Sequence, residues 1–406
     1  MPDPSMSDPS MPLAGIRVLD LSRVLAGPIC TMILADLGAE IIKVENPDGG
    51  DETRGMKPPE AGGEAHFYLS VNRTKKSVAI DISTTEGREL IHKLAAECDV
   101  LVENYRKGVM AKHGLDWEAM KDRHPHLVYC SISAYGRESP LADLPGFDPI
   151  LQAESGMMSL NGEPDGEPMR HALAIVDTMT GYYSTIGVMA AIMTQKETGR
   201  GQFVDVALFD VALNTLTNVG MYYFTSGKVP ERRGNGHPTS VPNGLFQASD
   251  GPFYIALANQ RLWKRFCEGV IDRPDMVDDP RYRTLSDRIA RRDEITAFLR
   301  DLFATRTRAE WLARFNKAGV PGGAVRTVDQ ALESPEAAAR DMVRTVAHPT
   351  AGSIRMVGSP LKLSATPVVE PVAPPLLGQH TDQVLADLLH LDADALAALR
   401  EAGAIV

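Results

Sequence analysis

The sequence predicts an α/β protein built on a parallel sheet that is covered by helices. Through the first 135 residues, short β-branched runs alternate with helical patterns of about 10 to 15 residues, which is the order that a parallel sheet requires. The chain has 406 residues, of which 44% are hydrophobic and 23% charged. This length exceeds one ordinary core, so we expect a large α/β domain and a smaller second domain.

The elements of the first domain follow in chain order. Apolar alternation predicts strands, and apolar spacing of three and four predicts helices. Strands are expected at residues 16–21, 39–45, 77–81, 99–104 and 127–133, and helices at 28–37 and 84–98. Ligands of such sheets bind at the carboxyl ends of the strands. The segments at those ends are residues 22–28, 46–54, 104–108 and 134–136.

The pattern changes near Gly199, where a long helix is expected to end. Beyond it we expect a strand at 203–207, one helix at 210–224 and a polar loop at 225–241. A short strand pair is expected at 253–257 and charged helices at 285–304. A Pro-rich segment at 367–375 then leads to a helical tail at the C-terminus. These patterns divide the chain into a disordered extension, a large domain, a small domain and a C-terminal segment, at 1–12, 13–224, 225–330 and 331–406.

Composition excludes several classes of function. A net charge of −11 argues against nucleic-acid binding, which rests on a basic face. No apolar run reaches the roughly 20 residues that cross a bilayer, and the first twelve residues are not a secretory signal, so we expect a cytoplasmic protein. The four cysteines lie far apart in apolar settings and predict buried thiols, not a metal site: Cys30, Cys98, Cys130 and Cys267.

Asp177 is the most informative candidate for chemistry. It follows the apolar run at 172–176, and a poorly solvated carboxylate is a candidate nucleophile for acyl groups. The alternative is that Asp177 is the N-cap of a helix beginning at Thr178. Basic runs at 73–76 and 106–107, with Lys112, are either phosphate contacts or solvated faces. No GxGxxG, P-loop or GxSxG motif is present.

Eight ordered motifs give the chain a family resemblance that runs from residue 13 to residue 406. They are PLAGIRVLD (12–20), AGP (26–28), LGAEIIKVE (37–45), GDETR (50–54), NRTKKS (72–77), VENY (102–105), TGRGQ (198–202) and LGQHT (377–381). The chain resembles the class III CoA-transferases, the group of formyl-CoA transferase, carnitine CoA-transferase and α-methylacyl-CoA racemase. The resemblance implies a Rossmann-like large domain that binds CoA, a small domain, a C-terminal segment that returns to the large domain, and a homodimer of two interlocked chains.

The resemblance also implies a mechanism. Asp177 matches the family's catalytic aspartate, which forms an anhydride with the acyl group and then a thioester with CoA. Acyl-CoA and a carboxylic acid are then the substrates, with neither a metal nor a permanently bound cofactor. The residues that match CoA contacts of the family are Arg23, Val24, Leu25, Ala26, Asn104, Tyr105, Lys112 and Tyr135.

Three departures narrow the substrate. Leu25 and Asn46 stand where formyl-CoA transferase has Gln and Arg, which argues against a formyl or oxalyl acyl group. Phe147 stands where the racemase has its catalytic His, so racemase activity, the alternative within the family, is disfavoured. We give His171 no catalytic role. An alternative outside the enzymes is a protein that binds CoA esters without turnover.

The acceptor is expected to be a dicarboxylate. Residues 234–239 and 242–246 look like the dicarboxylate-using members of the family, such as succinyl-CoA:glutarate transferase. Arg54, Arg233 and His237 are candidates to pair with the distal carboxylate, although each is also typical of a solvated loop. The glycines at 234 and 236 suit a mobile backbone and predict a loop near the ligand or a lid, while an interdomain linker remains the alternative.

Overall fold

The computed structural model describes residues 11–406, so residues 1–10 of the predicted N-terminal extension lie outside the described chain. The chain divides into two compact units: unit 1 contains the residues up to 157, 170–221 and 335–406, and unit 2 contains 158–169 and 222–334. The predicted large domain had included 158–169. These residues belong to unit 2 because they bond to its loop at 234, where the amide of Gly234 donates to Gly162 O at 3.1 Å.

Unit 1 is built on the parallel sheet that the sequence predicts. All of its strand pairs are parallel, and its order is β5-β2-β1-β6-β7-β8. The strands are β1 Arg17–Asp20, β2 Glu40–Glu45, β5 Lys75–Ala79, β6 Val100–Glu103, β7 Val128–Ser133 and β8 Phe203–Ala207. The strand order reverses between β1 and β6, which is the place where doubly wound sheets bind ligands.

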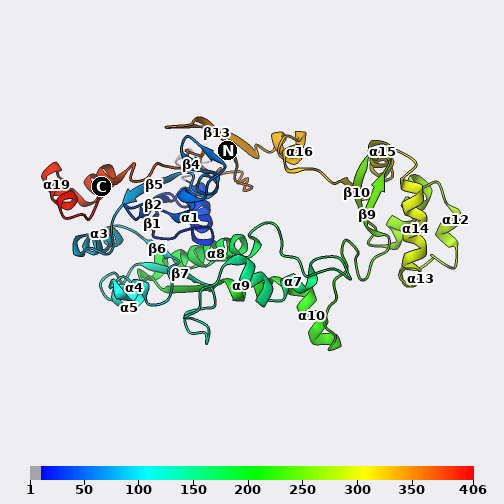
Figure 1. Cartoon of the computed structure of the whole chain (residues 1–406), viewed down its shortest axis with the longest axis horizontal. Helices are drawn as coiled ribbons and strands as arrows, with labels where there is room; N and C mark the ends of the chain where they lie inside the picture. The colour runs from blue at the N-terminus through cyan, green and yellow to red at the C-terminus, as the bar shows by residue number, and fades with distance from the viewer. Residues whose placement is uncertain (1–10) are drawn as a thin grey trace, which may run out of the picture. The chain divides into compact units, whose positions relative to one another are not determined.

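Helices cover both faces of this sheet (Figure 1). Side chains alternate along each strand, so that Val18 faces one core and Leu19 the other. One face is covered by α1 Ala26–Asp36, α6 Asp148–Glu154, α8 Ile175–Thr198 and α9 Leu208–Thr215. The other is covered by α3 Thr85–Ala96, α4 Val109–Lys112, α5 Trp117–Met120, α18 Thr381–Leu389 and α19 Ala393–Glu401.

Strand β5 begins two residues before the predicted start, at a pair of lysines. Both lysines have partners that allow them to lie in a strand. Lys75 is fully buried and donates to Asp20 Oδ2 at 3.1 Å and to Thr31 Oγ1 at 2.7 Å. Lys76 donates to Glu40 Oε1 at 2.6 Å on the neighbouring strand. Apolar periodicity does not reveal such pairs, so the prediction began the strand at the first apolar residues.

The remaining elements of unit 1 are short. They are η1 Glu52–Gly55, the hairpin of β3 Glu60–Ala61 and β4 Glu64–Ala65, α2 His66–Val71, α17 Pro335–Ala339, and the antiparallel pair of β12 Val343–His348 and β13 Gly352–Val357. Two further helices span the division between the units, α7 Met157–Leu160 and α10 Thr217–Ser226. The single helix predicted at 210–224 is therefore two helices, α9 and α10, separated at Leu216.

Unit 2 is a small α+β unit around an aromatic core. Phe303 lies at its centre, with ring centroids 4.9 Å from Phe253 and 5.0 Å from Trp311. Its antiparallel sheet is ordered β11-β10-β9. The elements are β9 Asn243–Ala248, β10 Gly251–Ala256, α11 Gln260–Arg265, η2 Phe266–Val270, α12 Asp275–Asp278, α13 Leu285–Ala290, α14 Arg292–Phe303, α15 Arg308–Ala318, β11 Gly322–Ala324 and α16 Val328–Leu332.

One prediction for unit 2 needs correction. The helix expected at 285–304 is broken at Arg291, which separates α13 from α14. Across residues 11–406, no helix is long and apolar enough to cross a membrane.

Candidate active site

Asp177 lies in the first turn of α8, and Asp148 caps that turn. The N-cap residue of α8 is Ala174, which has no capping side chain. Instead, Asp148 Oδ2 accepts from the amides of Val176 at 2.7 Å and Asp177 at 3.1 Å. The alternative interpretation of Asp177 as the N-cap is therefore wrong, because another carboxylate satisfies the free amides at this helix end.

Among the residues that the structure describes, the carboxylate of Asp177 has no hydrogen-bond partner. It is half-buried, and no side chain or amide within residues 11–406 donates a hydrogen bond to it. Burial, together with the negative charge of Asp148, raises the pKa of Asp177 to about 7. A carboxylate that is poorly solvated and unpaired is a stronger base and nucleophile than an ordinary aspartate.

Asp148 is itself held in place. Gln152 Nε2 donates to Asp148 Oδ1 at 2.5 Å, and Gln152 Oε1 accepts from the amide of His171 at 2.7 Å. His171 Nδ1 accepts from the amide of Leu173 at 3.2 Å, so the ring is engaged by the local backbone. The sequence did not single out Asp148. Its signal in the sequence is its position directly after Phe147, the residue that stands where the racemase has its catalytic His.

The packing of α8 on α1 places Asp177 near the segment between β1 and α1. A Cβ on Gly181 would lie 2.9 Å from Ala26 O, so only a glycine permits this approach. Thr185, one turn later, donates to Cys30 O at 3.5 Å, so the two helices run in the same direction. Asp177 is one turn before Gly181 on the same face and is therefore directed toward the residues just before Ala26.

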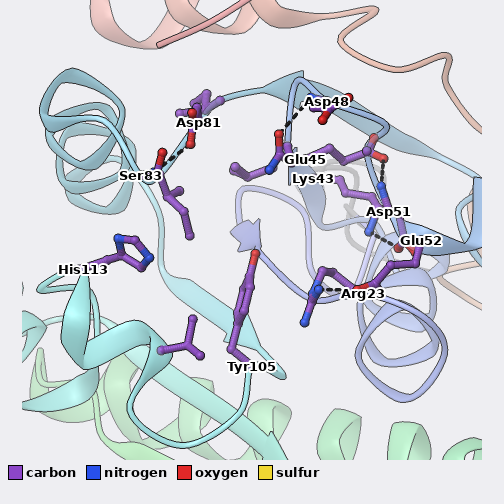
Figure 2. Close-up of a pocket in the computed structure, with 16 residues that line it drawn as sticks. Arg23, Lys43, Glu45, Asp48, Asp51, Glu52, Asp81, Ser83, Tyr105 and His113 are labelled. Carbon is purple, nitrogen blue, oxygen red and sulfur yellow. Dashed lines mark hydrogen bonds and ion pairs between the residues drawn. The ribbon is translucent and has the colours of Figure 1, made fainter. Parts of the chain in front are cut away.

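A cavity of about 570 Å³ opens at the carboxyl ends of β1, β2, β5 and β6 (Figure 2). Figure 2 shows Asp81, Ser83 and His113 on the side opposite Arg23 and Asp51. Further lining comes from Lys43, Val44, Glu45, Asn46, Asp48, Gly50, Glu52, Ile80, Ile82, Tyr105 and Val109. The volume is that of a small-molecule site, and its place is the reversal of strand order between β1 and β6.

Arg23 and Tyr105 meet at the rim of this cavity. The Arg23 guanidinium carbon lies 4.3 Å from the centroid of the Tyr105 ring, and Arg23 Nη1 donates to Glu52 Oε1 at 2.5 Å. The Asn104 side chain forms two hydrogen bonds with the Arg23 backbone. Its Oδ1 accepts from the Arg23 amide at 2.8 Å, and its Nδ2 donates to the Arg23 carbonyl at 2.7 Å. Three of the predicted CoA contacts are therefore brought together, and the arrangement offers a flat stacking surface and a cation.

The other predicted CoA contacts are placed differently. Residues 24–26 continue from Arg23 into α1. Lys112 is exposed at the end of α4, beside the cavity residue His113. Tyr135 does not line the cavity: its side chain is 6% exposed in the apolar core, and its hydroxyl donates to Glu154 Oε2 at 2.7 Å.

Arg54, a predicted substrate residue, forms ion pairs with two carboxylates of unit 1. Its guanidinium donates to both carboxylate oxygens of Glu45 at 2.8 Å and to Glu64 Oε2 at 2.9 Å, and it lies over the ring of Tyr68 at 3.7 Å. The side chain is only 8% exposed. A guanidinium that is buried and engaged in this way has little capacity left for a substrate carboxylate.

Arg233 and His237 belong to unit 2, where both are exposed. The Arg233 side chain has no hydrogen-bond partner within residues 11–406, and burial together with the Arg233 charge lowers the pKa of Arg292. His237 Nδ1 accepts from the amide of Thr239 at 3.3 Å.

No group of three or more His, Cys, Asp or Glu side chains in residues 11–406 is arranged to hold a metal ion.

Comparison with known proteins gives consistent matches over nearly the whole chain. A family model described as CoA-transferase family III matches residues 13–381. Succinyl-CoA:glutarate CoA-transferase of Homo sapiens is 37% identical over 97% of this chain and 90% of the relative. Succinate–glutarate CoA-transferase of Agrobacterium fabrum is 38% identical over 93% of this chain and 96% of the relative. The crystal structure of a CAIB/BAIF family protein from Brucella suis matches with a TM-score of 0.85 and 37% identity, over 94% of this chain and 100% of that one.

Proposed function

The chain belongs to CoA-transferase family III and is a CoA-transferase, and from this premise we propose that it moves CoA from succinyl-CoA or a similar dicarboxylic acyl-CoA to a dicarboxylic acid. The observation that carries the proposal is identity of 37% and 38%, over nearly full length, to two relatives named for succinate and glutarate. The loss of a polar side chain at Leu25 agrees with an acyl group other than formyl or oxalyl.

We propose that Asp177 carries the reaction. One of its carboxylate oxygens attacks the thioester carbonyl of the donor, the C–S bond breaks, and an aspartyl anhydride and CoA thiolate result. The thiolate attacks the aspartyl carbonyl, forming an aspartyl-CoA thioester and releasing the donor acid. The acceptor carboxylate attacks this thioester to give a second anhydride, and the thiolate then takes the acceptor acyl group and restores the carboxylate.

The surroundings of Asp177 support this sequence of steps. No donor in the described part of the chain forms a hydrogen bond to the carboxylate and disperses its charge, which favours attack on a carbonyl carbon. Its half-buried position also limits access by water, which would hydrolyse either intermediate. No step consumes or releases a proton overall, so no separate acid or base is required.

We propose that the cavity binds the nucleotide part of CoA. Arg23, which is half-buried, and Tyr105 provide a cation and a ring for the base or a phosphate, and Lys112, next in sequence to the cavity residue His113, adds an exposed cation. Of the carboxylates that also line the cavity, Glu45 pairs with Arg54, Asp51 with Lys43, and Glu52 with Arg23 itself. From the cavity, residues 23–26 lead toward Asp177, so the thioester end of CoA would follow this segment.

The acceptor would be bound by exposed cations. Arg233 is the strongest candidate among the residues predicted for this role, because it is exposed and has no carboxylate partner within residues 11–406. His237 lies in the same loop and is also exposed. The loop at 232–239 is anchored by Tyr254, whose hydroxyl donates to Asn235 O at 3.0 Å, so a lid movement there would have to break this bond.

We further propose that the chain acts as a homodimer, and the resemblance implies that its two chains interlock. The outer face of α8 supports this, since Tyr182, Ile186 and Met193 are 50%, 61% and 68% exposed. Apolar side chains at this spacing on one helix face are typical of a surface that a partner covers. Sedimentation of Ile186→Lys beside the unmodified protein tests this, and a monomeric unmodified protein would contradict it.

The function is tested by incubating the protein with succinyl-CoA and glutarate and measuring glutaryl-CoA by mass spectrometry. We expect glutaryl-CoA and succinate in equal amounts, and no product with Asp177→Ala. Equal turnover by the Asp177→Ala variant would exclude the proposed mechanism. Release of free CoA without glutaryl-CoA would instead identify a hydrolase.

A further inference from the structure

The backbone of Val24 is in a conformation that valine rarely adopts. Its φ is 68°, in the left-handed region, where the branched Cβ of valine crowds the backbone. Val24 immediately follows Arg23 and precedes Leu25, the N-cap residue of α1. Residues in this region persist only where their surroundings hold them, and they concentrate at functional sites.

Two side chains hold the backbone on either side of this strained position. Asn104, from the segment after β6, accepts from the Arg23 amide at 2.8 Å and donates to the Arg23 carbonyl at 2.7 Å. Asp51 Oδ1 accepts from the Val24 amide itself at 3.2 Å. The sequence separations are 81 and 27 residues, so the loop is fixed by distant parts of unit 1 and not by local preference.

Asp51 is in turn fixed by Lys43. Lys43 Nζ donates to Asp51 Oδ2 at 3.0 Å and to Ser22 O at 2.8 Å, and both charged side chains are fully buried. Although burial alone would raise it, the pKa of Asp51 is held well below its ordinary value by the Lys43 ammonium and by hydrogen bonds from Thr53. Lys43 thus connects the Asp51 carboxylate to the backbone carbonyl of Ser22, which lies at the start of the same loop.

We propose that Asp51 and Lys43 are positioning residues, which hold Val24 in its left-handed conformation and so set the course of residues 22–26 between the cavity and Asp177. This rests on the proposed function, in which that segment guides the CoA ester. Both residues also line the cavity, and the ion pair would act on the thioester end of CoA through residues 22–26. It lies where a stable charge pair can fix a strained loop without being altered by ordinary changes of pH.

A double-mutant cycle tests the proposal. We call the hydrogen bond from the Val24 amide to Asp51, together with the Lys43 ion pair that fixes Asp51, the clamp. Glycine adopts positive φ freely, so Val24→Gly should remove the need for the clamp. We expect Asp51→Ala to raise the KM for the acyl-CoA about tenfold with a smaller change in kcat, and to raise it at most about threefold when Val24→Gly is present. The same factor in both backgrounds would overturn the proposal, because Asp51 would then act by a route independent of Val24.

A matched control separates positioning from loss of stability. Asp36 is a second buried carboxylate of unit 1, paired with Arg73 at 2.5 Å. Asp36→Ala should lower the melting temperature as Asp51→Ala does, because each leaves a buried cation unpaired, but should leave the KM unchanged. An equal rise in KM with Asp36→Ala would show that general destabilisation explains the effect. If Asp51→Ala does not fold, Asp51→Asn takes its place in the cycle.

Hydrogen exchange of the Val24 amide distinguishes failure of this proposal from failure of the proposed function. Exchange at Val24 should be at least about tenfold faster in Asp51→Ala than in the unmodified protein, whether or not the protein transfers CoA. Unchanged exchange overturns the clamp even if the enzyme is active. If the unmodified protein transfers no CoA from any dicarboxylic acyl-CoA, the function fails, and the exchange result still decides the clamp.

Discussion

Replacement of Asp177 by asparagine should stabilise the folded protein at alkaline pH. The pKa of Asp177 is raised to about 7 by burial and by Asp148, against an ordinary value near 4. The proton therefore binds about a thousandfold more tightly in the folded chain, which is worth about 4 kcal/mol. Because Asp177 is half-buried, solvent screens part of this free energy. We therefore expect the substitution to raise the free energy of unfolding by about 2 kcal/mol.

The sign and the pH range follow from linkage. A raised carboxyl pKa destabilises the folded state when the group is ionised, so the effect is absent below about pH 4, grows as the pH rises, and is complete above about pH 7. Asp177→Asn should then be more stable than the unmodified protein by about 2 kcal/mol at pH 8 and by about a third of that at pH 5.

Urea denaturation at the two pH values measures this difference. A suitable control is Asp394→Asn, which also changes a first-turn aspartate, in α19, but an exposed one. The control should be neutral or slightly less stable, because a negative charge near a helix N-terminus is normally favourable. The reasoning is refuted if Asp177→Asn is no more stable than the unmodified protein at pH 8, or if its gain is equal at both pH values.

Three other variants test separate parts of the site. Because Asp177 must be ionised to attack, kcat/KM should fall below about pH 7, and Asp148→Asn should move that fall to lower pH by removing a neighbouring negative charge; an unshifted profile would contradict the role of Asp148. Arg54→Met should lower the free energy of unfolding by about 3 kcal/mol, because it removes the arginine partner of the buried Glu45. The ratio of the acceptor KM values for glutarate and a monocarboxylate should stay unchanged. A changed ratio would support Arg54 as a substrate residue. Arg233→Ala should raise the KM for a dicarboxylate about tenfold but not that for a monocarboxylate, and equal effects on both acceptors would exclude Arg233.

The sheet could be predicted from the sequence because its signal is local. Each strand carries apolar side chains for both faces, as Val18 and Leu19 show, and the intervening helices repeat at the expected spacing. The errors lie where pairing across the fold decides the outcome. Lys75 and Lys76 extend β5 because both pair with carboxylates on other strands, Asp20 and Glu40.

The site could be predicted only in part, for the same reason. Asp177 stands out in the sequence because it follows an apolar run. Asp148 is separated from it by 29 residues, and Asp51 from Val24 by 27, so neither interaction leaves a local pattern. Arg54 is a further case, since nothing near it in the sequence indicates that its guanidinium donates to Glu45 and Tyr68.

Trapping of the intermediate tests the central claim most directly. The protein is incubated with succinyl-CoA, treated with hydroxylamine, digested and analysed by mass spectrometry, beside Asp177→Ala. An aspartyl-CoA thioester at Asp177 would be converted to a hydroxamate, so we expect the modification on the peptide containing Asp177 and nowhere in the variant. Turnover of succinyl-CoA and glutarate without any modification at Asp177, or with the same modification in Asp177→Ala, would contradict covalent transfer through this residue.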